Sequence, residues 1–197
     1  MLAECSGLDW FNHVADRSLG EHNLPLKSAD ELFKIDADQP VLEAFKLMEE
    51  HHIGAVPVVE GSGSRKIIGN VSARDIRFLL MEPGVLDNQS DLSVRQMMEK
   101  VKRLHPHENQ GSVSKVIMTP PITCGRDETL KNVVHTLADY HIHRVYVTEE
   151  DGSLAGVVTI RDIISRFVTE PDNYFGNFFT RVIPSFPSSP EAQPVCD

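Results

Sequence analysis

Two stretches of the chain, 38–59 and 127–148, repeat one order of apolar and polar positions with a shift of 89 positions. In both stretches the apolar residues recur at intervals of three and four, which is typical of one face of an α-helix. This spacing predicts a helix of about three turns in each copy. The apolar positions are Val41, Ala44, Phe45 and Met48 in the first copy and Leu130, Val133, Val134 and Leu137 in the second.

Each helix is followed by two β-rich runs that are joined by a turn. The turns hold Gly61-Ser62-Gly63-Ser64 in the first copy and Asp151-Gly152 in the second, and both are typical of hairpins. The second β-rich runs nearly coincide, as GNVSARDI at 69–76 and GVVTIRDI at 156–163, and a further apolar-striped helix follows each. The copies thus share one order of elements. The first β-rich runs are 55–59 and 145–148, and short strand-like leads occupy 32–35 and 122–124.

A unit of about fifty residues can hardly bury one sheet face and two striped helices by itself. The two units are therefore predicted to pack sheet against sheet as one α+β body. The segment between them is expected to run over the surface, with a short helix near Val94 to Val101. The tail carries prolines among serines and is expected to be disordered. The predicted boundaries are 1–24 for an N-terminal segment, 25–82 and 113–170 for the repeats, 83–112 for the connector and 171–197 for the tail.

The charge of the chain argues against two classes of partner. With 29 acidic and 19 basic residues among 197, the formal net charge is −10, which disfavours nucleic acid and anionic membranes. No apolar run approaches the ~20 residues of a membrane helix. The three cysteines are far apart and suggest no disulfide framework, which fits a reducing compartment. We therefore expect a cytoplasmic or nuclear protein that binds neither nucleic acid nor membrane.

The repeated unit resembles a known family. GAVPVV with GNVSARDI, and HRVYV with GVVTIRDI, are similar to a pair of cystathionine-β-synthase (CBS) domains, the arrangement called a Bateman module. The resemblance covers roughly Pro25 to Val168. LDWF at 8–11, LPL at 24–26 and EPDNYFGNFF at 170–179 further resemble the C-terminal half of the plant gamma-type regulatory subunit of the sucrose-non-fermenting-related kinase, a relative of the AMP-activated protein kinase. Those subunits carry four repeats, and this chain has two.

The resemblance implies a non-catalytic regulatory subunit that senses energy state. An adenine nucleotide (AMP, ADP or ATP) would lie in the cleft between the sheets, and the partners would be the catalytic and beta-type subunits of the kinase. A structural scaffold with an empty or vestigial cleft is the alternative. The chain contains no GxSxG, HExxH or Walker motif, so we expect no enzyme activity. A CBS pair in isolation is expected to form a homodimer.

Two acidic residues stand three positions after a hydroxyl residue. The resemblance implies that Asp162 with Thr159, and Asp75 with Ser72, bind ribose hydroxyls, and a carboxylate can accept two hydrogen bonds from a vicinal diol. The alternative is a carboxylate that only caps the first turn of a helix. Recurrence with the same flanks in both copies favours the nucleotide site.

The remaining site residues also follow from the resemblance. His143 and Arg144 match a phosphate-binding pair, although they could instead face solvent at the end of a strand. The first copy has Gly54-Ala55 there, so the two sites should differ. A base pocket lined by Ser28, Phe33, Ile53 and Gly54 is implied for one site, with Asp162 on its ribose side, and these residues could equally be core.

Two further sets of residues are less specific. Arg74 and Arg161 precede the two aspartates and could reach phosphate, but surface pairing with carboxylates is favoured. His141 and His143 form an HxH without a third ligand at suitable spacing, so no metal site is expected.

Overall fold

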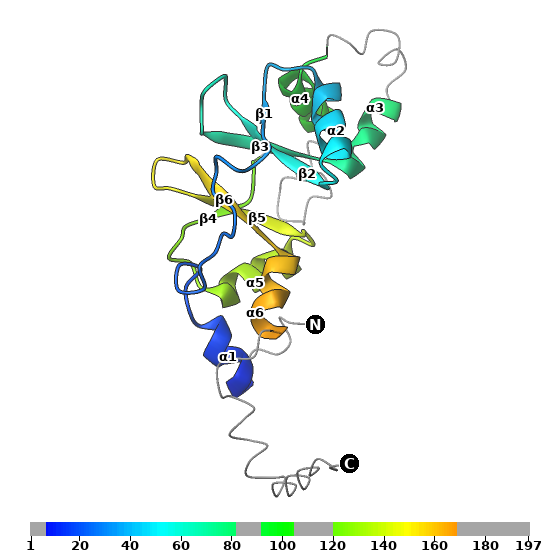
Figure 1. Cartoon of the computed structure of the whole chain (residues 1–197). Helices are drawn as coiled ribbons and strands as arrows, with labels where there is room; N and C mark the ends of the chain where they lie inside the picture. The colour runs from blue at the N-terminus through cyan, green and yellow to red at the C-terminus, as the bar shows by residue number, and fades with distance from the viewer. Residues whose placement is uncertain (1–6, 82–91, 105–119, 169–197) are drawn as a thin grey trace, which may run out of the picture.

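The computed structural model describes residues 7–81, 92–104 and 120–168, and these contain two three-stranded sheets of identical topology (Figure 1). In each sheet a short strand runs parallel to the middle strand, which forms an antiparallel hairpin with the third. The registers repeat as well, because Ile35 pairs with Val58 and Cys124 with Val147. The strands are β1 (Ile35–Asp36), β2 (Ala55–Val59), β3 (Ile67–Ser72), β4 (Thr123–Cys124), β5 (Arg144–Thr148) and β6 (Leu154–Thr159).

The predicted helices are present in both copies. Helices α2 (Val41–Glu50) and α5 (Leu130–Asp139) bury the apolar stripe that the sequence indicates. The helix after the third strand is α3 (Ile76–Met81) in the first copy and α6 (Ile160–Val168) in the second. These elements confirm the predicted α+β class and the duplicated unit.

The two sheets lie between two layers of helices, with α2, α3 and α4 on one side and α1, α5 and α6 on the other (Figure 1). The hairpins meet through a bridge between Lys66 and Ser153 and through the amide of Leu154, which donates to the Arg65 carbonyl at 2.7 Å. A small shared core contains residues from both repeats, including Ile67 and Tyr146. The sheets therefore pack together as predicted.

Helix α1 (Asp9–Ala15) precedes the first repeat but packs on the second, against α5 and α6. Phe11 is fully buried, and its ring stacks on Phe167 with centroids 5.2 Å apart. Leu19 and Leu24, which follow α1, lie in the core of the second repeat. The N-terminal segment is thus a structural part of the second repeat.

The expectation that 83–112 is a surface connector is wrong for its described part, 92–104. The predicted short helix is present as α4 (Val94–Leu104), and Ser93 caps its start through reciprocal hydrogen bonds with Gln96. Its apolar stripe is buried in the core of the first repeat, because helical spacing brings the residues of the stripe to one face. These residues are Val94, Met97, Met98 and Val101.

The predicted disorder of the tail stays untested by the fold. The tail from 171 onward lies outside the described residues. Within 7–81, 92–104 and 120–168, no helix has both the length and the apolar character needed to cross a bilayer.

Candidate functional site

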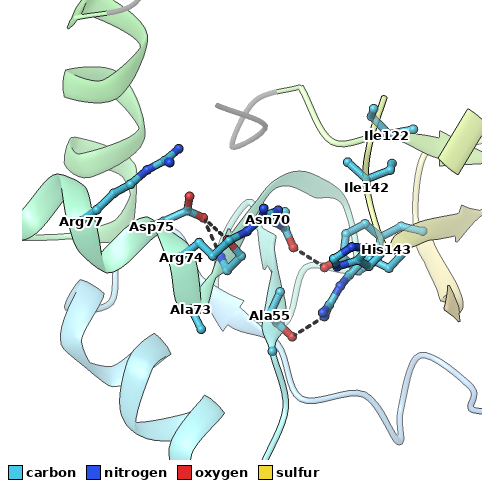
Figure 2. A pocket seen from close by; sticks show the side chains of 13 residues that line it. Ala55, Asn70, Ala73, Arg74, Asp75, Arg77, Ile122, Ile142 and His143 are labelled. Carbon is cyan, nitrogen blue, oxygen red and sulfur yellow. Dashed lines mark hydrogen bonds between the residues drawn. The ribbon is translucent and has the colours of Figure 1, made fainter. Parts of the chain in front are cut away.

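A cavity of about 450 Å³ lies where the two repeats meet (Figure 2). One wall comes from the ends of β2 and β3 and the start of the following helix, and the other comes from the second repeat. Its volume is in the range of small-molecule sites. The lining residues are Gly54, Ala55, Asn70, Ser72, Ala73, Arg74, Asp75 and Arg77 from the first repeat, and Ile122, Ile142, His143, Arg144 and Tyr146 from the second.

Asp75 is the buried acid of the cavity, with 6% of its surface exposed. Its Oδ2 accepts hydrogen bonds from the Ser72 amide and hydroxyl, each at 2.7 Å. No described residue donates to Oδ1, which is not sealed from solvent. The helix-capping role and the binding role are therefore compatible, because one carboxylate oxygen closes the first turn and the other remains to accept from a ligand.

Asp162 makes the same local structure outside this cavity. Its Oδ2 accepts from the Thr159 amide at 2.8 Å and from the Thr159 hydroxyl at 2.7 Å. Neither Asp162 nor Thr159 lines the cavity. The structure thus brings His143 and Arg144 together with the aspartate of the first repeat, not with that of their own repeat.

The implied base pocket of the first repeat does not line this cavity, except at Gly54. The Ser28 hydroxyl donates to Glu31 at 2.8 Å, and Phe33 stacks on His51 with centroids 3.6 Å apart. Ile53 packs against the core of the first repeat. A binding role for Ser28, Phe33 and Ile53 stays a prediction.

The counterparts of that pocket in the second copy do line the cavity. A shift of 89 positions takes Phe33 to Ile122 and Ile53 to Ile142, and both isoleucines face the cavity from the wall opposite Asp75 (Figure 2). Sequence reasoning missed Ile122 and Ile142, although the same shift would have found them once the first pocket was named.

Arg144 reaches across the junction between the repeats. Its Nη1 donates to the carbonyl of Ala55 at 3.1 Å. Ala55 is the residue of the first copy that corresponds to Arg144 in the second. A Cβ atom on Gly54 would lie 3.2 Å from Arg144 Nη2. This close approach favours glycine at position 54, because a larger residue would require the Arg144 guanidinium to shift. Phosphate binding by Arg144 stays a prediction, and part of its guanidinium already has a protein partner.

Asn70 and Tyr146 join the repeats on the floor of the cavity. The Tyr146 hydroxyl donates to Asn70 Oδ1, and burial raises the pKa of Tyr146, which keeps the hydroxyl protonated. Sequence reasoning missed this pair. The available signal was a polar residue, Asn70, where the second copy has Val157.

The described residues offer no metal centre and no evident nucleophile. Among them, no group of three histidine, cysteine, aspartate or glutamate side chains is placed to hold a metal ion. His141 Nδ1 lies 2.6 Å from the Ala138 carbonyl oxygen. Burial raises the pKa of the Cys124 thiol to about 12, so this thiol is a poor nucleophile at neutral pH.

The duplicated unit and its cavity define a tandem CBS module. The CBS domain family matches residues 28–82 and 113–169, and the chain belongs to this family. The chain is 43% identical, over 93% of its length, to the SNF1-related protein kinase regulatory subunit gamma-1 of Arabidopsis thaliana. It is also 43% identical, over 89% of its length, to the gamma-1-like subunit of the same plant. The chain spans 43% and 38% of these relatives, respectively. Their names are those of regulatory subunits, which agrees with the prediction of a non-catalytic module.

Solved structures show the same fold. The CBS domain of a bacterial CNNM/CorC family Mg2+ transporter superposes with a TM-score of 0.58 at 19% identity, covering 86% of each chain. The same domain in complex with ATP superposes with a TM-score of 0.57 at 20% identity, covering 82% of this chain and 94% of that one. CBSX2 in complex with AMP superposes with a TM-score of 0.51 at 17% identity, covering 76% of this chain and 94% of that one. At these identities the comparison confirms the fold of a CBS pair.

Proposed function

We propose that this chain acts as a gamma-type regulatory subunit of a sucrose-non-fermenting-related protein kinase and binds an adenine nucleotide in the cavity between its repeats. The observation that carries the proposal is Asp75 Oδ1, which has no protein donor among the described residues and lies at a cavity with an opposite apolar wall. The structural relatives that hold ATP and AMP support the ligand class.

Each wall of the cavity suits one part of such a ligand. Ile122 and Ile142 offer apolar surface to the adenine ring. Asp75 Oδ1 can accept from the ribose hydroxyls, while Ser72 fixes the orientation of the carboxylate. His143 and the arginines supply donors for phosphate oxygens.

The proposed partners are the catalytic and beta-type subunits of the kinase, in the cytoplasm or nucleus. The names of the curated relatives support a kinase complex. A bound nucleotide would shift the complex between two states only by the difference in its affinity for them. Regulation therefore requires that the cavity differ between the two states.

The first test replaces Asp75 with asparagine. The amide oxygen can still accept from Ser72, but a nitrogen donor takes the place of the free oxygen, so the ribose hydroxyls lose their charged acceptor. We expect the affinity for AMP, ADP and ATP to fall about 10- to 100-fold. Isothermal titration calorimetry on the full chain measures it, and thermal melting checks that the variant is folded.

Asp162→Asn is the comparator, because it alters the same capping arrangement away from the cavity. It also tests the second predicted site. If a nucleotide binds at Asp162, the number of nucleotides bound per chain should be lower by one in Asp162→Asn than in the wild type. Equal affinity losses in both variants would indicate a general effect of the substitution and would remove Asp75 from the site.

A scaffold with an empty cleft is the second candidate. It is favoured by the engagement of Arg144 with Ala55, which ties up part of the expected phosphate ligand. It predicts no heat with any adenine nucleotide while kinase subunits still bind. The proposed sensor predicts heat on titration with an adenine nucleotide as well as binding of the kinase subunits.

The apolar residues left exposed on α3 and α6 support the expected homodimer of the isolated chain. Ile76, Leu80 and Ile164 are 44%, 64% and 45% exposed. Ile76 and Leu80 are four positions apart on α3 and share a face. A second copy could cover this surface.

We therefore expect light scattering near twice 22.0 kDa for the wild type. In Leu80→Asp, a charge in the apolar contact should raise the dimer dissociation constant about 10-fold or more. Lys100→Gln lowers the net charge by the same one unit at an exposed position on another helix and serves as the control. A wild-type monomer at micromolar concentration would refute the dimer.

A further inference from the structure

The amide of Asn70 offers the cavity a hydrogen-bond donor that no described protein group uses. Asn70 lies on β3, two positions before Ser72, so the two side chains leave the strand on the same face and both line the cavity. Asn70 Oδ1 accepts from the Tyr146 hydroxyl. Asn70 Nδ2 has no acceptor among the described residues, and it is not sealed from solvent. This nitrogen can therefore donate to a ligand in the cavity.

Tyr146 fixes which end of the Asn70 amide is left for a ligand. Tyr146 is 3% exposed, and burial raises the pKa of its hydroxyl, which therefore keeps its proton at neutral pH. Arg144 lies two positions away on the same face of β5, and it is hydrogen-bonded to the Tyr146 oxygen. Because a guanidinium only donates, the single hydroxyl proton is available to Asn70 Oδ1. The amide cannot turn round without losing this hydrogen bond.

The fold of the repeat does not require this pair. In the second copy Val157 stands in place of Asn70, and in the first copy Pro57 stands in place of Tyr146. Neither side chain can make a hydrogen bond, so the same pair cannot form at the second predicted site. A polar pair that is present on one side of the duplicated unit and replaced by apolar residues on the other indicates a role in the cavity itself.

The position of Asn70 suits contact with the base of a nucleotide. Figure 2 shows Asn70 between Asp75 on one side and Ile122 and Ile142 on the other, and all four residues line the cavity. A nucleotide with its ribose at Asp75 and its base against the isoleucines would therefore pass over the Asn70 amide.

An amide held in this orientation is complementary to adenine. Adenine has a ring-nitrogen acceptor beside its amino group, so the ring nitrogen can accept from Asn70 Nδ2 while the amino group donates to the second lone pair of Oδ1. A 6-oxopurine has an acceptor in place of the amino group. In the same position it would face Oδ1 with a second acceptor, and the amide would have to turn round to pair with it.

We propose that Asn70 recognises the edge of the adenine base, and that Tyr146 is a positioning residue that holds the Asn70 amide in the orientation that favours adenine over 6-oxopurines. This inference rests on the proposed nucleotide site and adds to it the residue that selects the base.

The test is calorimetry of the full chain with AMP and IMP, and with ATP and ITP, because the members of each pair differ only in the base. For the wild type we expect the adenine nucleotide to bind about 10-fold or more tightly. Asn70→Asp keeps the acceptor for Tyr146 but replaces Nδ2 with an oxygen, so this preference should disappear. Asn12→Asp makes the same change on α1, outside the cavity, and should keep the preference.

Tyr146→Phe tests the positioning role. Without the hydroxyl the Asn70 amide is free to turn and can pair with either base, so the ratio of the two affinities should fall toward one. A purely structural role of Tyr146 would weaken the binding of both nucleotides equally and leave the ratio unchanged. Thermal melting checks that each variant is folded.

The outcomes separate this inference from the proposed function. If the wild type binds IMP and ITP as tightly as AMP and ATP, or if Asn70→Asp keeps the wild-type preference, the role of Asn70 is refuted while nucleotide binding stands. An unchanged ratio in Tyr146→Phe would refute the positioning role. If neither AMP nor ATP binds the wild type, the proposed function and this inference both fail.

Discussion

Replacing Phe11 with alanine is expected to lower the free energy of unfolding by about 3–5 kcal/mol, because it removes a fully buried ring and leaves a cavity. The ring stacks on Phe167 at an interplanar angle of 3°, so part of an aromatic contact is lost as well. The effect is large because α1 closes the second repeat, against α5 and α6, although it precedes the first repeat in sequence.

Urea denaturation followed by circular dichroism measures this change. Leu8→Ala, at a position that is 49% exposed beside the start of the same helix, is the control and should change stability by less than about 0.5 kcal/mol. A loss below about 1 kcal/mol in Phe11→Ala would mean that α1 is not part of the core. A single transition is expected in each variant, because the repeats share hydrogen bonds and a common cluster of apolar residues.

The repeated elements could be predicted from the sequence because their signals are local. A stripe such as Leu130 to Leu137 identifies a helix without knowledge of its partner. The sequence predicts β2 with its observed bounds, and β5 begins one residue earlier than predicted. Each prediction is supported by the same pattern in both copies.

The partners of these elements could not be predicted in the same way. Helical spacing shows that Met97 and Met98 are apolar neighbours, but not whether they face a core or a kinase subunit. Likewise, the shift between copies shows that Ile53 and Ile142 are equivalent, but not which of them faces a cavity with Asp75. That choice depends on how the two sheets are set against each other, which is a property of tertiary packing.

The two copies differ in sequence at the junction of the repeats. Arg144 and Ala55 are counterparts and contact each other, and a Cβ atom on Gly54 would lie close to the Arg144 guanidinium. The second copy carries the cation, and the first carries Gly54-Ala55. The two predicted sites therefore differ in charge, and under the proposed function a nucleotide should bind them unequally.

Replacing Met97 with alanine tests the core of the first repeat, as Phe11→Ala tests that of the second. Met97 is 2% exposed on α4 and packs with Val94, Val101 and the core of the first repeat. Its removal is expected to cost about 2–5 kcal/mol. Met97→Leu nearly conserves volume and should cost less than about 1.5 kcal/mol, and exposed Lys100→Ala should cost little.

Urea denaturation again measures these differences, and nucleotide titration of the same variants shows what they do to the site. Residues of α4 do not line the cavity, so Met97→Ala should change affinity only as far as it unfolds the first repeat, which holds Asp75. If Met97→Ala and Lys100→Ala were equally stable, 92–104 would be a surface connector after all. The first repeat would then have to bury its apolar helix face against another chain.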